Sequence, residues 1–240
     1  MTMAHPLTHN EIFMVSPINA ILEGLYETPL TIAELKQHGD FGIGTFNDLN
    51  GELILLNGIA YRFDVDGLVH MVNDEEKTPF AAACFFEPFS DEEIQSPLDY
   101  SAFSHFLERC LPSPNLLYAI RVEGRFSRIR TRSVPRTENY TPLVEATAFQ
   151  KELLLENVEG TLVGFHTPKF MPSINVPGYH FHFISKDCRY GGHLLECTLS
   201  CGRLSLQICS RLLLNMPMTL DYLSVDFNRD AREDLEKAER

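Results

Sequence analysis

The sequence lacks the features of a membrane-spanning or exported protein. No run of about 18 apolar residues occurs, so no transmembrane helix is predicted. Residues 1–19 contain no basic segment followed by an apolar stretch, which argues against a secretory signal. The six cysteines form no C-x-x-C pair, and a zinc site drawn from Cys188, Cys197 and Cys201 lacks the usual spacing. We therefore expect a cytoplasmic protein with reduced thiols.

Basic residues are also scarce. Lys and Arg total 20 against 33 Asp and Glu, which gives a net charge of −13 and a pI of about 5.1. This balance argues against nucleic acid or anionic membrane as the main partner. Residues 121–136 are locally positive, and this stretch suggests an anionic small molecule rather than a polyanion.

The pattern of apolar residues favours an α+β fold. A chain of 240 residues can bury a core as one large domain or two small ones. Many short alternating segments, with no βαβ rhythm, predict mixed, mainly antiparallel β-sheets with a few flanking helices. The polar stretch 136–142 suggests a boundary between an N-terminal domain, residues 1–135, and a C-terminal domain, residues 136–240. Similar strand openings at 51–54 and 160–163 are compatible with two related domains, or with the commonness of such strands.

Individual elements follow from periodicity and from helix-terminating residues. Thr31 and Glu34 form a candidate capping box, Asn57-Gly58 a hairpin turn, and Asn228 a candidate cap of the last helix. The predicted helices are 18–26, a short helix from Thr31 to near Gly39, 96–111 and 229–239. The predicted strands are 52–56, 59–63, 68–72, 79–86, 115–123, 125–134, 160–165, 179–184, 194–199 and 203–214.

One predicted strand carries a pair of histidines. Residues 179–184 alternate aromatic or aliphatic residues with histidine, so His180 and His182 point to the same face. His193 follows a Gly191-Gly192 pair, which permits a tight bend back towards that strand. Three imidazoles brought together in this way can occupy three corners of a zinc tetrahedron and leave the fourth for water or substrate. The pattern therefore predicts a catalytic metal site.

Such a site needs a group that transfers protons and a group that holds substrate charge. Glu52, at the start of a strand, is a candidate carboxylate, and Arg130 and Arg132 alternate onto one strand face as candidate anion clamps. On general exposure trends, a Glu or Arg at a strand end is usually a solvated surface group. The residues by themselves thus predict a metal-dependent enzyme acting on a small anion, and no more.

Four blocks of sequence resemble the acetolactate decarboxylase family. The resemblance extends from about Phe41 to the end of the chain, and the block with the histidines is the most specific. The blocks are residues 44–53, 130–135, 159–165 and 177–184, the last followed by 191–193.

The resemblance implies both an activity and a set of site residues. The activity is zinc-dependent decarboxylation of 2-acetolactate to acetoin and CO2, in acetoin and butanediol biosynthesis, by a homodimer. No thiamine or pyridoxal motif is present, in agreement with this chemistry. The implied residues are His180, His182 and His193 as ligands of Zn2+, Glu52, Arg132 and Glu239 as catalytic groups, and Thr45 and Arg132 as substrate contacts. Glu233 and Glu236 are alternatives to Glu239 as the glutamate from the C-terminal tail.

Two other functions compete with this interpretation. The strand-H-x-H…Gly-Gly-His pattern also resembles small PPC-type domains of DNA-associated regulatory proteins, which are shorter and often carry a basic AT-hook. The second is another zinc-dependent lyase or hydrolase of a small acid. Release of CO2 from acetolactate distinguishes a decarboxylase from a hydrolase, since a hydrolase produces none.

Overall fold

The computed structural model describes residues 10–239. The strands are β1 (Glu11–Met14), β2 (Phe41–Thr45), β3 (Glu52–Leu56), β4 (Ile59–Phe63), β5 (Val69–Met71), β6 (Ala81–Cys84), β7 (Ser90–Ile94), β8 (Leu117–Ser133), β9 (Lys151–Thr167), β10 (Gly178–Ser185), β11 (Gly191–Cys209) and β12 (Arg211–Leu214). The helices are α1 (Ile18–Leu22), α2 (Ile32–Leu35), α3 (Tyr100–Cys110), α4 (Leu143–Thr147), α5 (Leu220–Ser224) and α6 (Arg232–Ala238), with a 3-10 turn η1 (Asn47–Leu49).

These strands form two sheets. The seven-stranded sheet has the order β12-β1-β6-β2-β3-β4-β5 and is mixed, because β1 and β12 pair in parallel. The five-stranded sheet has the order β10-β9-β8-β11-β7 and is antiparallel. Strand β10 also pairs with β11, so this second sheet closes on itself. The predicted α+β class, with mainly antiparallel sheets and few helices, is confirmed.

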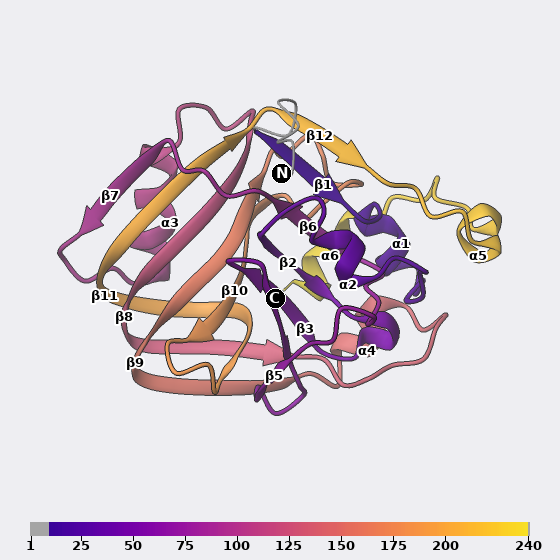
Figure 1. The fold of residues 1–240 in the computed structure, drawn as a ribbon, viewed down its shortest axis with the longest axis horizontal. Helices are drawn as coiled ribbons and strands as arrows, with labels where there is room; N and C mark the ends of the chain where they lie inside the picture. Colours follow the sequence, from indigo (N-terminus) through magenta and orange to yellow (C-terminus); the bar gives the residue numbers. More distant parts are fainter. Residues whose placement is uncertain (1–9, 240) are drawn as a thin grey trace, which may run out of the picture.

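The three longest strands, β8, β9 and β11, curve around one end of the molecule (Figure 1). Gly124 of β8 lies opposite Gly160 of β9 on one side and Gly202 of β11 on the other. A Cβ atom on Gly124 would lie 2.5 Å from the carbonyl oxygen of Cys201. A row of residues without side chains therefore allows the three backbones to approach closely at this point.

Apolar clusters join the layers. Helix α3 packs Phe103 and Leu107 against the five-stranded sheet, and Figure 1 shows it beside the long strands. A second cluster lies between the two sheets, where Ile54 of β3 and Val163 of β9 are both buried. A third cluster joins α1, α4 and α6. This last cluster matters for the site because it anchors the end of the chain.

Several local predictions are confirmed. Strands β3 and β4 form a hairpin through Asn57 and Gly58, both with positive φ. The Thr31 side chain accepts a hydrogen bond from the Glu34 backbone N–H, and the Glu34 side chain accepts one from the Thr31 N–H, which completes the capping box.

Other boundaries were wrong. The strands predicted at 115–123 and 125–134 are one strand, β8, because Gly124 is paired rather than part of a turn. Strand β9 begins at Lys151, well before residue 160. The first helix ends at Leu22, two residues before Gly24, whose φ is +79°. The last helix begins at Arg232, and the Asn228 side chain bonds to Asp226 instead of capping it.

The sheets do not follow the division predicted at residue 135. Strand β8 precedes that position, yet it pairs with β9 and β11, which follow it. Strand β1 likewise pairs with β12 from the other end of the chain. The two-domain boundary stays a prediction. Within residues 10–239 no helix is long and apolar enough to cross a membrane.

Candidate metal centre and active site

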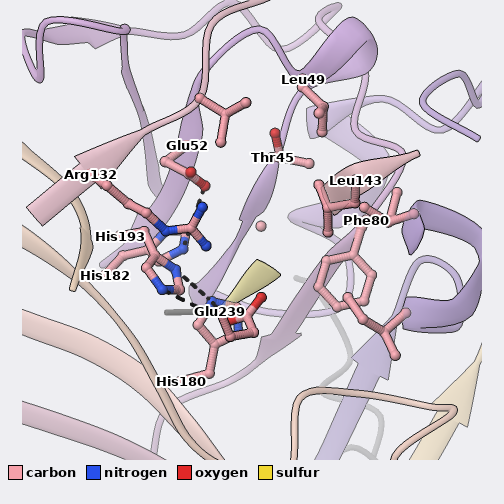
Figure 2. Close-up of a pocket in the computed structure, with 14 residues that line it drawn as sticks. Thr45, Leu49, Glu52, Phe80, Arg132, Leu143, His180, His182, His193 and Glu239 are labelled. Carbon is pink, nitrogen blue, oxygen red and sulfur yellow. Dashed lines mark hydrogen bonds and ion pairs between the residues drawn. The ribbon is translucent and has the colours of Figure 1, made fainter. Parts of the chain in front are cut away.

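Three histidines converge where β10 meets β11. His180 and His182 lie on the same side of β10, and the antiparallel register places His193 of β11 directly opposite His182. One ring nitrogen of each lies within 4.8 Å of the others, and all three side chains are buried. Figure 2 shows the three rings pointing toward one another at one side of a pocket.

The connection that brings His193 back differs from the prediction. The chain reverses over residues 186–190, where the Ser185 N–H donates to the Tyr190 carbonyl at 2.8 Å. Gly191 and Gly192 are already part of β11, so the expected Gly-Gly bend is wrong. Gly192 has φ +148°, and a Cβ atom there would lie 2.7 Å from the carbonyl oxygen of Arg132. Glycine at 192 therefore permits close approach of β8.

The three rings are held neutral. Burial, and then the charge of Arg132, lowers the pKa of His180 to about 3. Burial is also the main reason that the pKa values of His182 and His193 lie well below the ordinary value. A neutral imidazole keeps a lone pair on one ring nitrogen, which is the form that binds a metal ion.

A hydrogen bond to a backbone carbonyl sets the direction of the His182 lone pair. The Nδ1–H of His182 donates to the carbonyl oxygen of Leu53 at 2.9 Å, which leaves Nε2 as the acceptor atom. His180 Nε2 and His193 Nδ1 lie only 3.1 Å apart. Three buried neutral imidazoles, with one ring nitrogen each within 4.8 Å of the others, are a ligand set that suits zinc or a similar divalent ion. The residues present thus fit a metal centre.

Two carboxylates lie beside the histidines. Glu52 begins β3, and its Oε2 lies 3.7 Å from His182 Nε2. Glu239 directly follows α6, and its Oε2 lies 3.7 Å from His193 Nε2 and 3.8 Å from His180 Nε2. Burial raises the pKa of Glu52 to about 7, with Arg132 opposing the rise and Glu239 adding to it. Burial also raises the pKa of Glu239.

Arg132 supplies the positive charge of the site. It lies on β8 directly opposite His193 and is buried. Its Nη1 donates to Gln150 Oε1 at 2.9 Å, and its Nη2 donates to the Ala238 carbonyl at 2.6 Å. Its Nε is buried and has no hydrogen-bond partner within the part of the chain that the structure describes. The Nε–H of the guanidinium therefore remains available to donate a hydrogen bond.

Of the other two predicted residues, Thr45 lines this pocket and Arg130 does not. The Thr45 hydroxyl donates to the Gly51 carbonyl at 2.9 Å. Arg130, the second candidate clamp, instead forms ion pairs with Glu152 and Glu196 at 3.0 and 3.4 Å.

The pocket has a polar wall and an apolar wall. Figure 2 shows Glu52, Arg132 and the histidines on one side and Phe80 and Leu143 on the other. No sequence signal marks these apolar residues, because they are indistinguishable from ordinary core residues. The apolar lining consists of Ile18, Ile21, Leu49, Phe80, Val134 and Leu143.

Comparison with known proteins shows which family this chain belongs to. The family model for alpha-acetolactate decarboxylase matches residues 12–229. A Methanosarcina mazei alpha-acetolactate decarboxylase is 42% identical over 230 residues, which cover 95% of this chain and 80% of that protein. A Methylococcus capsulatus protein of the same name is 39% identical, over 98% of this chain and 92% of that protein.

Solved structures show the same architecture. The crystal structure of alpha-acetolactate decarboxylase from Bacillus subtilis strain 168 superposes with a TM-score of 0.93 at 36% identity. That match covers 95% of this chain and 99% of the other. With a family model over most of its length, and relatives of which it covers 80% to 99%, the chain belongs to the alpha-acetolactate decarboxylase family.

Proposed function

We propose that this chain is a carboxy-lyase that converts 2-acetolactate to acetoin and CO2 with zinc held by His180, His182 and His193. The observation that carries the proposal is the meeting of three buried, neutral imidazoles with Glu52 and Arg132 around one pocket. Membership of the family supplies the substrate and the reaction class. It also favours an enzyme over a PPC-type binding module.

The metal would be held by the three imidazoles, and zinc suits a site made of neutral histidines. When bound there, zinc would supply Lewis-acid polarisation of substrate oxygen atoms. The Leu53 carbonyl supports this arrangement, because it fixes the tautomer in which His182 Nε2 is the ligand atom.

The substrate carries its own electron acceptor. Acetolactate is a 2-hydroxy-3-oxo acid, so the electron pair of the broken C–CO2 bond moves into the adjacent carbonyl and gives an enediolate. A proton added to the carbon that lost CO2 then gives acetoin. This balance needs neither an oxidant nor an organic electron sink. The protein has to bind the carboxylate, stabilise developing negative charge and deliver one proton.

Arg132 binds the substrate carboxylate in this mechanism. It is buried beside His193, where the low dielectric strengthens attraction to an anion. The apolar wall opposite, which includes Phe80 and Leu143, excludes water and keeps that attraction strong.

Glu52 delivers the proton. Burial raises its pKa to about 7 before a metal binds, so near neutral pH this carboxyl group can both give up and regain a proton. Glu239, on the side of His180 and His193, is placed to accept a hydrogen bond from the substrate hydroxyl. This assignment makes Glu239, rather than Glu233 or Glu236, the glutamate that enters the site.

The deciding experiment is an acetolactate assay that measures acetoin and CO2 together. Purified protein is assayed as isolated, after chelation, and after chelation followed by zinc. We expect activity to disappear and then return. Full activity in metal-free protein would refute the metal requirement, and consumption of substrate without CO2 would indicate a hydrolase.

A homodimer in the cytoplasm completes the proposal. The assembly follows from family resemblance, and sedimentation equilibrium measures it directly. A monomer over the micromolar range would contradict the dimer.

A further inference from the structure

The surroundings of Arg132 differ from those of other arginines on the same strand. Its two terminal nitrogens donate to an amide oxygen, on Gln150, and to a backbone carbonyl, on Ala238. Both acceptors are neutral. Within residues 10–239, no carboxylate forms an ion pair with Arg132, although Glu52 and Glu239 lie in the same pocket.

Arg130, two residues earlier on β8, has the opposite arrangement. Its guanidinium contacts the carboxylates of Glu152 and Glu196. Those two negative charges compensate its positive charge, so little attraction is left for another anion. Within the described residues, Arg130 thus has two carboxylates in direct contact, whereas Arg132 has only neutral acceptors in direct contact and acts on Glu52 and Glu239 through space.

The two neutral acceptors are themselves well fixed. Gln150 ends the turn after α4, where its backbone N–H donates to the Thr147 carbonyl at 3.0 Å. Ala238 lies in α6 and is fully buried in the cluster that also contains Leu143 and Leu235. Helices α4 and α6 pack together in this cluster. The side-chain oxygen of Gln150 and the carbonyl oxygen of Ala238 therefore hold the guanidinium from two segments that are packed against each other.

We propose that Gln150 is a positioning residue that makes the site selective for a carboxylate. It orients Arg132 by accepting from Nη1, and as a neutral amide it leaves the charge of Arg132 available to the substrate. This inference rests on the proposed role of Arg132 in binding the substrate carboxylate.

Two substitutions separate this role from a merely structural one. Gln150→Glu keeps the hydrogen-bond acceptor and nearly the same shape, but it adds a negative charge next to Arg132. Gln150→Met keeps the length and the neutrality, but it removes the acceptor. If the role of Gln150 is only structural, the Glu variant should bind an anion as the unmodified protein does, and the Met variant should bind it less well. Our proposal predicts the reverse order for recognition of an anion.

The probe is 2,3-dihydroxy-2-methylbutanoate, in which a hydroxyl replaces the keto group so that decarboxylation cannot occur. Its neutral amide is the matched probe without charge. Titration calorimetry on zinc-loaded protein gives the ratio of the amide Kd to the acid Kd. We expect a ratio of at least about tenfold in the unmodified protein, since hydrogen bonds to charged groups have this strength.

In Gln150→Glu we expect that ratio to fall by roughly tenfold, and in Gln150→Met by a smaller factor. Gln37→Glu adds the same charge at an exposed position and should leave the ratio unchanged. Zinc content and thermal unfolding, measured on every variant, show that the pocket is intact. For turnover, we expect Gln150→Glu to raise KM more than it lowers kcat.

The outcomes are distinguishable. If the unmodified protein binds acid and amide equally, the proposed role of Arg132 fails. If it prefers the acid and Gln150→Glu prefers it as strongly, the role of Gln150 is overturned while that of Arg132 stands. Should Gln150→Glu not fold, an unchanged ratio in Gln150→Met overturns the inference, and a reduced ratio supports it.

Discussion

The Nδ1–H of His182 donates to the Leu53 carbonyl at 2.9 Å, although 129 residues separate the two along the chain. This bond joins the seven-stranded sheet to the histidine strand of the other sheet. It also places the neighbouring residue, Glu52, beside His182. One backbone carbonyl therefore aligns a ligand and a carboxylate at the same time.

Loss of one histidine should abolish metal binding. His182→Ala removes one of three nitrogen donors, and we expect zinc affinity to fall by more than about 100-fold. Acetoin formation should fall in parallel. Zinc content after gel filtration measures the loss, and His105→Ala, an exposed histidine on α3, is the control. Stoichiometric zinc in His182→Ala would contradict the ligand assignment.

Glu52→Gln should retain zinc but lose turnover. The amide has the shape of the carboxyl group but cannot deliver a proton, so we expect kcat to fall by roughly 10² to 10⁴-fold. Stopped-flow assays of CO2 and acetoin measure the loss. Glu156→Gln, on an exposed part of β9, is the matched control. Equal kcat for Glu52→Gln and the unmodified protein would exclude Glu52 as the proton donor.

Arg132→Ala should weaken turnover while the fold persists. Loss of the charge that holds the carboxylate should lower kcat/KM by about 10² to 10³-fold. Because Arg132 also binds the Ala238 carbonyl, we expect faster proteolysis near α6 as well. Arg128→Ala, exposed on the same strand, is the control. Unchanged kcat/KM in Arg132→Ala would remove it from the mechanism.

Metal binding should release protons near neutral pH. The pKa of Glu52 is raised to about 7, so a nearby divalent cation favours its ionised form and displaces protons. The histidines contribute little, because their pKa values already lie well below 7. Zinc affinity should therefore rise with pH from 6 to 8. Calorimetry in two buffers of different ionisation enthalpy measures the release, which should be smaller in Glu52→Gln.

Gly192→Ala should damage both stability and metal binding. Its φ is +148°, and the new Cβ would lie 2.7 Å from a backbone oxygen of β8. We expect a loss of about 1 to 3 kcal/mol from backbone strain, with more from the close contact. Gly58→Ala also has positive φ, but nothing lies within 4 Å of its Cβ. The denaturation midpoint of Gly192→Ala should fall well below that of Gly58→Ala.

The sequence carried different amounts of information about different parts of the site. Alternation along 179–184 was sufficient to place His180 and His182 on one face, and the structure agrees. The full length of β8 was not predictable, because Gly124 is a strand residue only when Gly160 and Gly202 flank it.

Partners of the site residues were harder to predict. The Leu53 carbonyl and the Ala238 carbonyl act through the backbone, which has no signature in the sequence. Gln150 is an ordinary amide until α4 places it beside Arg132. Glu52 and Arg132 were only two of several charged residues at strand positions, and family resemblance selected them.

The closing of the five-stranded sheet has a consequence for how the active protein forms. His182, His193 and Arg132 come from three strands and meet only because β10, β11 and β8 lie in one register. A slip of one residue would turn His193 away from the pocket, since side chains alternate along a strand. Zinc uptake during refolding therefore monitors correct strand alignment. A chain with a shifted register among β10, β11 and β8 would be compact yet unable to hold the ion.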